Sequence, residues 1–247
     1  MINLSLIEFI FSTIIFIFAY MITHTISGSL QAYSTYLLGD PTARQEGFLS
    51  LNPLVHLDPF GIFALLFFGI GWFQTVPIDP SYFRGPWGSL KLGAAFFVEA
   101  LISIILAIIS LFICVCSFSS VLRIRDLIGL VFSYRPIAAI FSSSGAHFNM
   151  ASLFAAFDSP LSIVIAYLLI AIVYLNILIA TVSIIYNGFR YMLAIGAEKS
   201  YSYMEYADYF TFFGPILVLF LFIDPLINYF MRVTEWVAYH MAFVCGV

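Results

Sequence analysis

Four long apolar stretches dominate the pattern of hydrophobic and polar positions along the chain. They cover Ile2–Ile22, Leu92–Leu122, Leu161–Met192 and Phe210–Phe230, and each is long enough for the roughly 20 residues that cross a bilayer as a helix. A fifth apolar stretch, Phe60–Phe73, is too short for a full crossing and contains three glycines. The pattern predicts an all-α integral membrane protein with about four transmembrane helices and a short re-entrant or interfacial hairpin.

Composition and charge support this class and exclude others. The chain has 247 residues, of which 63% are hydrophobic and 9% charged, whereas a soluble domain carries about 25% charged residues. The net charge of −4 without a basic cluster argues against nucleic acid as a partner. The nine Lys and Arg residues divide almost equally between the two expected sides, so charge predicts no orientation. Three cysteines without a CxxC spacing make a disulfide framework unexpected.

The segment that follows the first apolar stretch carries the most specific motif. Residues 37–61 read LLGDPTARQEGFLSLNPLVHLDPFG, and a second motif follows over residues 71–83, GWFQTVPIDPSYF. Both resemble the site-2 protease family of intramembrane zinc metalloproteases, in particular its small bacterial-type members without a PDZ domain. The resemblance implies one membrane domain over residues 1–230 and an interfacial C-terminal tail over residues 231–247.

Two later motifs of that family survive only in outline. Its AGPxxN motif corresponds to Ala94–Glu99, so that Glu99 stands where the family has asparagine. Its NLxPxxPLDG motif maps onto Asn176–Gly188, which puts Asn187 at the position of the aspartate ligand. The resemblance therefore covers most of the chain, but it is most specific before Phe83.

The zinc-binding positions implied by the resemblance are degenerate. In HExxH, two histidines four apart bind zinc and the glutamate activates water. Here the first ligand is His24, the base position is Thr25, the second ligand position is Gly28 and the third is Asn187. A catalytic zinc takes three protein ligands, and a hydroxyl is too weak a base near neutral pH. We therefore expect zinc to be lost and no cofactor to replace it.

This loss leads to an interpretation of the chain as a catalytically inactive site-2 protease homologue, a pseudoenzyme. It would act as a structural or accessory subunit of a larger membrane complex, with membrane lipids and other transmembrane subunits as partners. The resemblance implies a multi-pass protein of a bacterial inner membrane or an organellar inner membrane.

An alternative is an active but atypical zinc metalloprotease in which His56 joins His24. The third ligand would be a carboxylate, Asp58 or Asp40, because zinc accepts such donors. On the simpler interpretation, His56 and Asp58 hydrogen-bond to the backbone and fix their loop.

Glu99 is the remaining candidate, because an ionisable side chain within a membrane segment indicates function by default. It is predicted to contact a partner helix or to form the polar centre of a carrier. The simpler interpretation is that it faces the bundle interior and is satisfied by a hydrogen bond.

Overall fold

The computed structural model describes residues 2–68, 74–118, 121–132, 159–197 and 204–246. In chain order these residues form the following helices: α1 (Ile2–Leu38), α2 (Thr42–Gln45), α3 (Pro53–His56), α4 (Pro59–Phe68), the 3-10 helix η1 (Pro80–Tyr82), α5 (Gly88–Ser117), α6 (Val121–Phe132), α9 (Pro160–Ala197) and α10 (Met204–Cys245). The described residues contain no strand. The prediction of an all-α membrane protein is confirmed.

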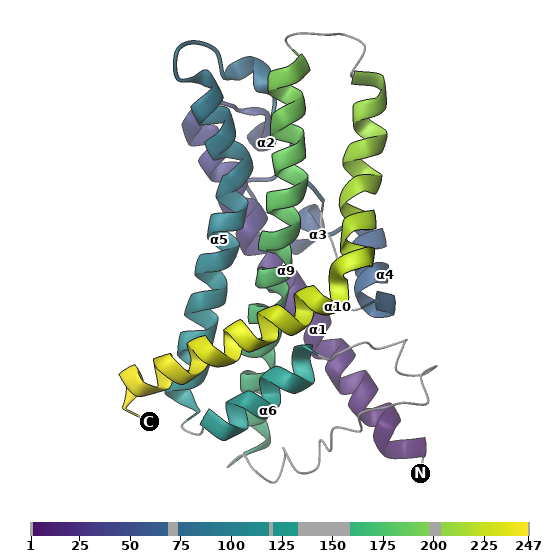
Figure 1. Cartoon of the computed structure of the whole chain (residues 1–247), viewed down its shortest axis with the longest axis vertical. Coiled ribbons are helices and arrows are strands. Elements are labelled where there is room, and N and C mark those ends of the chain that lie inside the picture. The colour runs from purple at the N-terminus through teal and green to yellow at the C-terminus, as the bar shows by residue number, and fades with distance from the viewer. Residues whose placement is uncertain (1, 69–73, 119–120, 133–158, 198–203, 247) are drawn as a thin grey trace.

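Three helices are long and apolar enough to cross a membrane, over Ile10–Leu38, Gly88–Ser117 and Pro160–Gly196. They correspond to the first three predicted spans. In Figure 1, α5 and α9 run side by side along the long axis of the molecule, and both contact α1. These three helices form the membrane core on which the other elements are placed.

The first helix continues 16 residues beyond the predicted end of its apolar stretch, to Leu38. Its polar side chains are compatible with this because they bond to the carbonyl one turn earlier. Thr25 donates to Met21, Ser27 to Thr23 and Thr35 to Gln31, at 2.6 to 2.9 Å. Such bonds satisfy hydroxyls inside the bundle, so the helix tolerates polar residues where hydropathy alone predicts an end.

Aromatic side chains join the core helices at one level of the bundle. Phe16 of α1 contacts Tyr167 and Tyr174 of α9 edge to face, with ring centroids 6.3 and 5.9 Å apart. Phe132 of α6 packs on Tyr174 at 5.0 Å. Each such pair contributes about 1 kcal/mol beyond its buried area, so α6 is firmly attached to the core.

The remaining predictions need revision. The hairpin expected over Phe60–Phe73 is represented by one short helix, α4, and residues 69–73 lie outside the described part. After α5 the chain forms a further helix, α6, and residues 133–158 also lie outside the described part. The predicted fourth span, Phe210–Phe230, is part of α10, most of whose first half is described as backbone only.

The 42-residue helix α10 changes direction within its length. Its first half runs beside α9, and its second half crosses the lower end of the bundle next to α6 (Figure 1). Pro225 lies in its interior, where proline removes one backbone donor and clashes with the preceding turn. A disulfide between Cys116 and Cys245 ties the end of α10 to the end of α5, so the expectation of no disulfide was wrong.

Candidate functional site

The GDPT motif after α1 serves as a structural joint. Gly39 adopts φ 113°, a conformation that favours glycine. The fully buried Asp40 accepts from Thr42 N through Oδ1 and from Asp79 N through Oδ2, each at 2.9 Å. Both carboxylate oxygens thus hold two loops together, which removes Asp40 as the third ligand of the alternative zinc site in this arrangement.

The NPLVH motif builds the short helix that presents His56 to α1. Asn52 accepts from Leu54 N at 3.1 Å as the N-cap, and Pro53 begins α3, as the preferences for these positions predict. His56 ends the helix and is completely buried. Its Nε2 lies 2.8 Å from the Ser50 carbonyl and 3.2 Å from the Ser29 hydroxyl, so the imidazole is held by both α1 and the loop before α3.

The ring of His56 occupies the space beside Gly28. A Cβ atom built on Gly28 would lie 2.5 Å from His56 Nδ1 and 3.1 Å from Cε1. Gly28 is the position at which HExxH has its second histidine. The His56 ring thus fills the space that a side chain at residue 28 would need, and its buried Nδ1 has no hydrogen-bond partner among the described residues.

His24 lies one turn before Gly28 on the same helix and is completely buried. The Tyr20 ring packs edge to face on it, with centroids 4.0 Å apart. On the other side, Asn176 of α9 donates to Thr23 Oγ1 at 3.2 Å and to the Ile172 carbonyl at 2.8 Å. The structure thus brings two imidazoles and an amide into one buried region.

Sequence analysis missed Tyr20 and Ser29 as parts of this region. The signal that could have revealed the arrangement was Gly28 itself, because a glycine at a position expected to carry an imidazole leaves room for another side chain. No pattern within α1 identifies which distant residue fills that room.

Asn187 does not face this region. Its Nδ2 donates to Glu99 Oε2 at 3.1 Å and to Ser183 Oγ at 2.8 Å, and Ser183 Oγ donates to Glu99 Oε2 at 2.7 Å. All three side chains are buried between α5 and α9. The third-ligand position of the family is therefore engaged with α5 instead of with His24, and Glu99 is held by hydrogen bonds as its simpler interpretation predicts.

Asp58 is the other carboxylate considered for a metal. Its Oδ1 accepts from Gly61 N at 2.9 Å at the start of α4. The described residues contain no group of three or more His, Cys, Asp or Glu that could hold a metal ion. They offer a pair of histidines and do not complete the three-ligand set of a catalytic zinc, so we assign no reaction step to a metal here.

A comparison with curated proteins adds a relative. The chain is 39% identical over 66 residues to a Bacillus subtilis (strain 168) protein named "Putative zinc metalloprotease YwhC". This stretch is 27% of the chain and 30% of the relative, so the similarity covers less than a third of either. No protein-family model matches the chain, and no solved structure matches it.

The match supports the resemblance to the site-2 protease family over the stretch that it covers. It also corrects one interpretation. The chain was taken to be a pseudoenzyme because Thr25, Gly28 and Asn187 replace the chemical residues, but its relative bears the name of a zinc metalloprotease. The interpretation as a non-enzyme is therefore wrong on this comparison. Its physical weakness is that it set aside the alternative in which His56 joins His24, although the His56 ring lies beside Gly28.

Proposed function

We propose that this chain is an atypical intramembrane metalloprotease of the site-2 protease type, with His24 and His56 as its histidine pair. The observation that supports this pair most directly is that the His56 imidazole fills the space of a side chain at Gly28, one helical turn from His24. Complete burial of both rings favours a function, since a buried imidazole that only packs could be replaced by an apolar side chain.

The proposal assigns zinc to this pair by the chemistry of the donors. Neutral imidazole is a common zinc ligand, and His56 Nδ1 is buried without a hydrogen-bond partner among the described residues. Asp58 is the carboxylate that the proposal needs as third ligand, because its Oδ2 takes no part in the hydrogen bond to Gly61. For Asp58 to reach His24 and His56, the loop that joins α3 to α4 would have to rearrange.

The test is metal content and cleavage with the full chain purified from its membrane. We expect about one zinc per chain, falling to near zero in His24→Ala and in His56→Ala. His240→Ala is the matched control, because His240 is exposed and hydrogen-bonds only within α10, to the Trp236 carbonyl at 2.8 Å. Cleavage of single-span model substrates in proteoliposomes should follow the same pattern. A wild-type protein without zinc would overturn the proposal.

A second candidate is an accessory role within a larger membrane complex. It is favoured by Thr25 and Asn187, whose side chains at the base and third-ligand positions make structural hydrogen bonds to Met21 and Glu99. An accessory subunit should migrate on native gels in a stable complex with other transmembrane proteins. Migration as a single chain, together with stoichiometric zinc, would favour the metalloprotease over the accessory subunit.

A further inference from the structure

A pocket of about 470 Å³ lies between α6 and the second half of α10. Arg125 lines it from α6, and Arg232, Glu235, Trp236 and Tyr239 line it from α10. Its floor is apolar, formed by the buried residues Ile128 and Ala238. It is separate from the histidine pair and belongs to no motif of the sequence, so an inference about it is independent of the proposed function.

The two helices that form the pocket lie across the end of the bundle. Figure 1 shows α6 and the second half of α10 running across the axis of α5 and α9. Because α5 and α9 have the length and composition of membrane spans, helices that cross them at one end lie along the membrane surface. Such an orientation is typical of interfacial amphipathic helices.

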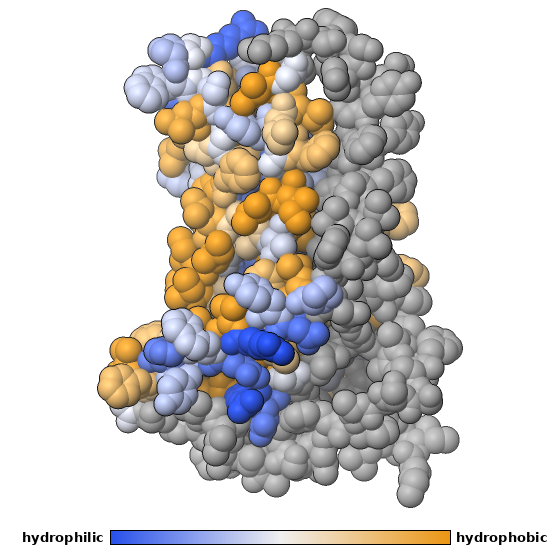
Figure 2. Space-filling model, viewed as in Figure 1, coloured by the Kyte–Doolittle hydropathy of each residue, from blue (hydrophilic) through white to orange (hydrophobic). Residues whose placement is uncertain are grey.

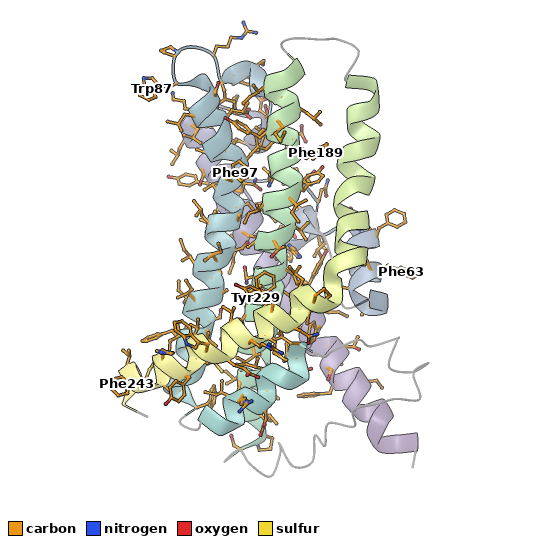
Figure 3. All side chains as sticks on the ribbon, viewed as in Figure 1. Phe63, Trp87, Phe97, Phe189, Tyr229 and Phe243 are labelled. Carbon is orange, nitrogen blue, oxygen red and sulfur yellow. A yellow bond between two sulfur atoms is a disulfide. The ribbon has the colours of Figure 1, made fainter. Side chains whose placement is uncertain are left out.

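The faces of α10 agree with an interfacial position. Ile227, Thr234, Ala238 and Ala242 are buried and recur at helical spacing, so one face packs on the protein. The opposite face exposes aromatic residues, namely Tyr229, Trp236, Tyr239 and Phe243, each more than 60% exposed. Figure 3 shows Phe243 at one end of the molecule and Trp87 at the other. Exposed aromatic residues are enriched at the two interfaces of a bilayer.

The pocket has an excess of positive charge. It contains two arginines and one glutamate, which gives a net charge of +1 in a chain whose net charge is −4. Arg125 lies 3.6 Å from Glu235, whereas Arg232 makes no ion pair with any residue that the structure describes. Figure 2 shows hydrophilic side chains gathered where α10 crosses the bundle, below the apolar surface of α5. An exposed guanidinium beside an ion pair is suited to bind an anion in bidentate fashion.

We propose that this pocket binds the phosphate of an anionic phospholipid, with Arg232 and Arg125 as phosphate ligands and Trp236 and Tyr239 beside the glycerol and upper acyl chains. Arginines and exposed aromatic residues on a helix at the membrane surface are the features that recognise anionic lipid headgroups. An acidic protein segment would satisfy the charge equally, but the membrane-plane orientation and the apolar floor favour a lipid. The disulfide between Cys116 and Cys245 fixes the end of α10 and so helps to hold the pocket walls.

The experiment compares lipids retained by the intact chain. Wild-type protein is equilibrated in mixed micelles with phosphatidylglycerol or phosphatidylcholine, and bound lipid is counted by native mass spectrometry. We expect a preference for phosphatidylglycerol that falls about fivefold in Arg232→Gln, since one basic residue near a membrane surface contributes about a fivefold change. Arg232→Lys should retain only part of it, because lysine keeps the charge but lacks the bidentate fork of the guanidinium. The matched control is Arg84→Gln, because Arg84 is equally exposed but is far from the pocket.

Three outcomes would overturn the proposal. Equal retention of both lipids by wild-type protein would exclude an anionic lipid and leave the pocket to an acidic segment of a protein partner. A preference that survives in Arg232→Gln would place the lipid elsewhere. Inorganic phosphate that saturates the pocket, without any lipid preference, would indicate a free anion as ligand. Unfolding measurements on Arg232→Gln verify that a lost preference does not reflect a misfolded protein.

Discussion

Two buried polar regions of the membrane core differ in how their side chains are satisfied. Around Glu99, one carboxylate oxygen, Oε2, accepts from both Ser183 and Asn187 between α5 and α9, while Oε1 is buried without a hydrogen-bond partner among the described residues. Around His24 and His56, the contacts are an aromatic ring, a carbonyl and a hydroxyl, and His56 Nδ1 is left without a partner among the described residues. The hydrogen bonds of the first region join two helices, whereas the unpartnered atom of the second is an imidazole nitrogen, a type of ligand that zinc accepts.

The comparison also shows how carboxylate and amide have changed places. By the family resemblance, an asparagine belongs at residue 99 and an aspartate at residue 187, but the chain has Glu99 and Asn187. One acceptor and one amide donor remain in both arrangements. In this chain the carboxylate lies on α5 and the amide on α9, and the hydrogen bond between them joins the two helices.

The largest effect is expected from Glu99→Ala. This substitution leaves the buried donors of Ser183 and Asn187 without this acceptor, and a buried polar group left unsatisfied costs about 1–3 kcal/mol. We expect the free energy of unfolding in detergent to fall by about 3 kcal/mol, measured by SDS denaturation. The control Glu46→Ala removes an exposed carboxylate and should cost less than about 0.5 kcal/mol. Equal losses in the two variants would contradict a structural role for the cluster.

Asn187→Asp tests the exchange of carboxylate and amide. It restores the family's ligand, but it places a second carboxylate against Glu99, since the present distance from Nδ2 to Oε2 is 3.1 Å. Like charges in a buried site disfavour ionisation of both, so we expect a loss of about 2 kcal/mol and no gain in bound zinc. Adding Glu99→Asn should recover stability. If Asn187→Asp alone raised zinc content, residue 187 would have to face His24, contrary to the structure.

Gly28→Ala tests the histidine region directly. Its Cβ would lie 2.5 Å from His56 Nδ1, so the imidazole has to move. We expect a loss of about 1.5 kcal/mol, as in other overpacked sites, together with loss of bound zinc. The double variant with His56→Ala should be more stable than the sum of the two single changes by about 1 kcal/mol. Strict additivity in this cycle would show that residue 28 and His56 are not in contact.

Sequence patterns predict the fold where a physical signal is local. The three membrane helices follow from apolar length, and the loop motifs GDPT and NPLVH form capped turns because Asp40 and Asn52 accept from nearby backbone donors. The end of α1 was predicted too early, because Thr25 and Thr35 satisfy their hydroxyls on their own helix and hydropathy counts them only as polar.

The candidate site was less predictable because it depends on contacts between distant parts of the chain. His56 reaches Gly28 across 28 residues, and Asn187 reaches Glu99 across 88. A resemblance assigns Asn187 to the zinc position by alignment, but only the packing of α9 against α5 determines which neighbour its amide meets. The close approach of the His56 ring to Gly28 likewise has no signature within either motif.

Ser29→Ala is expected to have the smallest effect, and it tests whether the polar contacts around His56 serve a metal or only the fold. The Ser29 hydroxyl lies 2.5 Å from the Thr25 carbonyl and 2.7 Å from the Ser50 carbonyl, to either of which it can donate, and 3.2 Å from His56 Nε2. It therefore links α1 to the loop that carries the imidazole. Ser34 offers a matched control because its hydroxyl donates to its own helix, to the Leu30 carbonyl at 2.8 Å. We expect Ser29→Ala to lower the free energy of unfolding by about 1 kcal/mol and Ser34→Ala to leave it within about 0.5 kcal/mol. If zinc affinity falls with Ser29→Ala while stability is unchanged, the hydroxyl orients His56 for the metal. If stability alone falls, the hydroxyl has a structural role, and the region around His24 and His56 resembles the Glu99 cluster despite its unpartnered Nδ1.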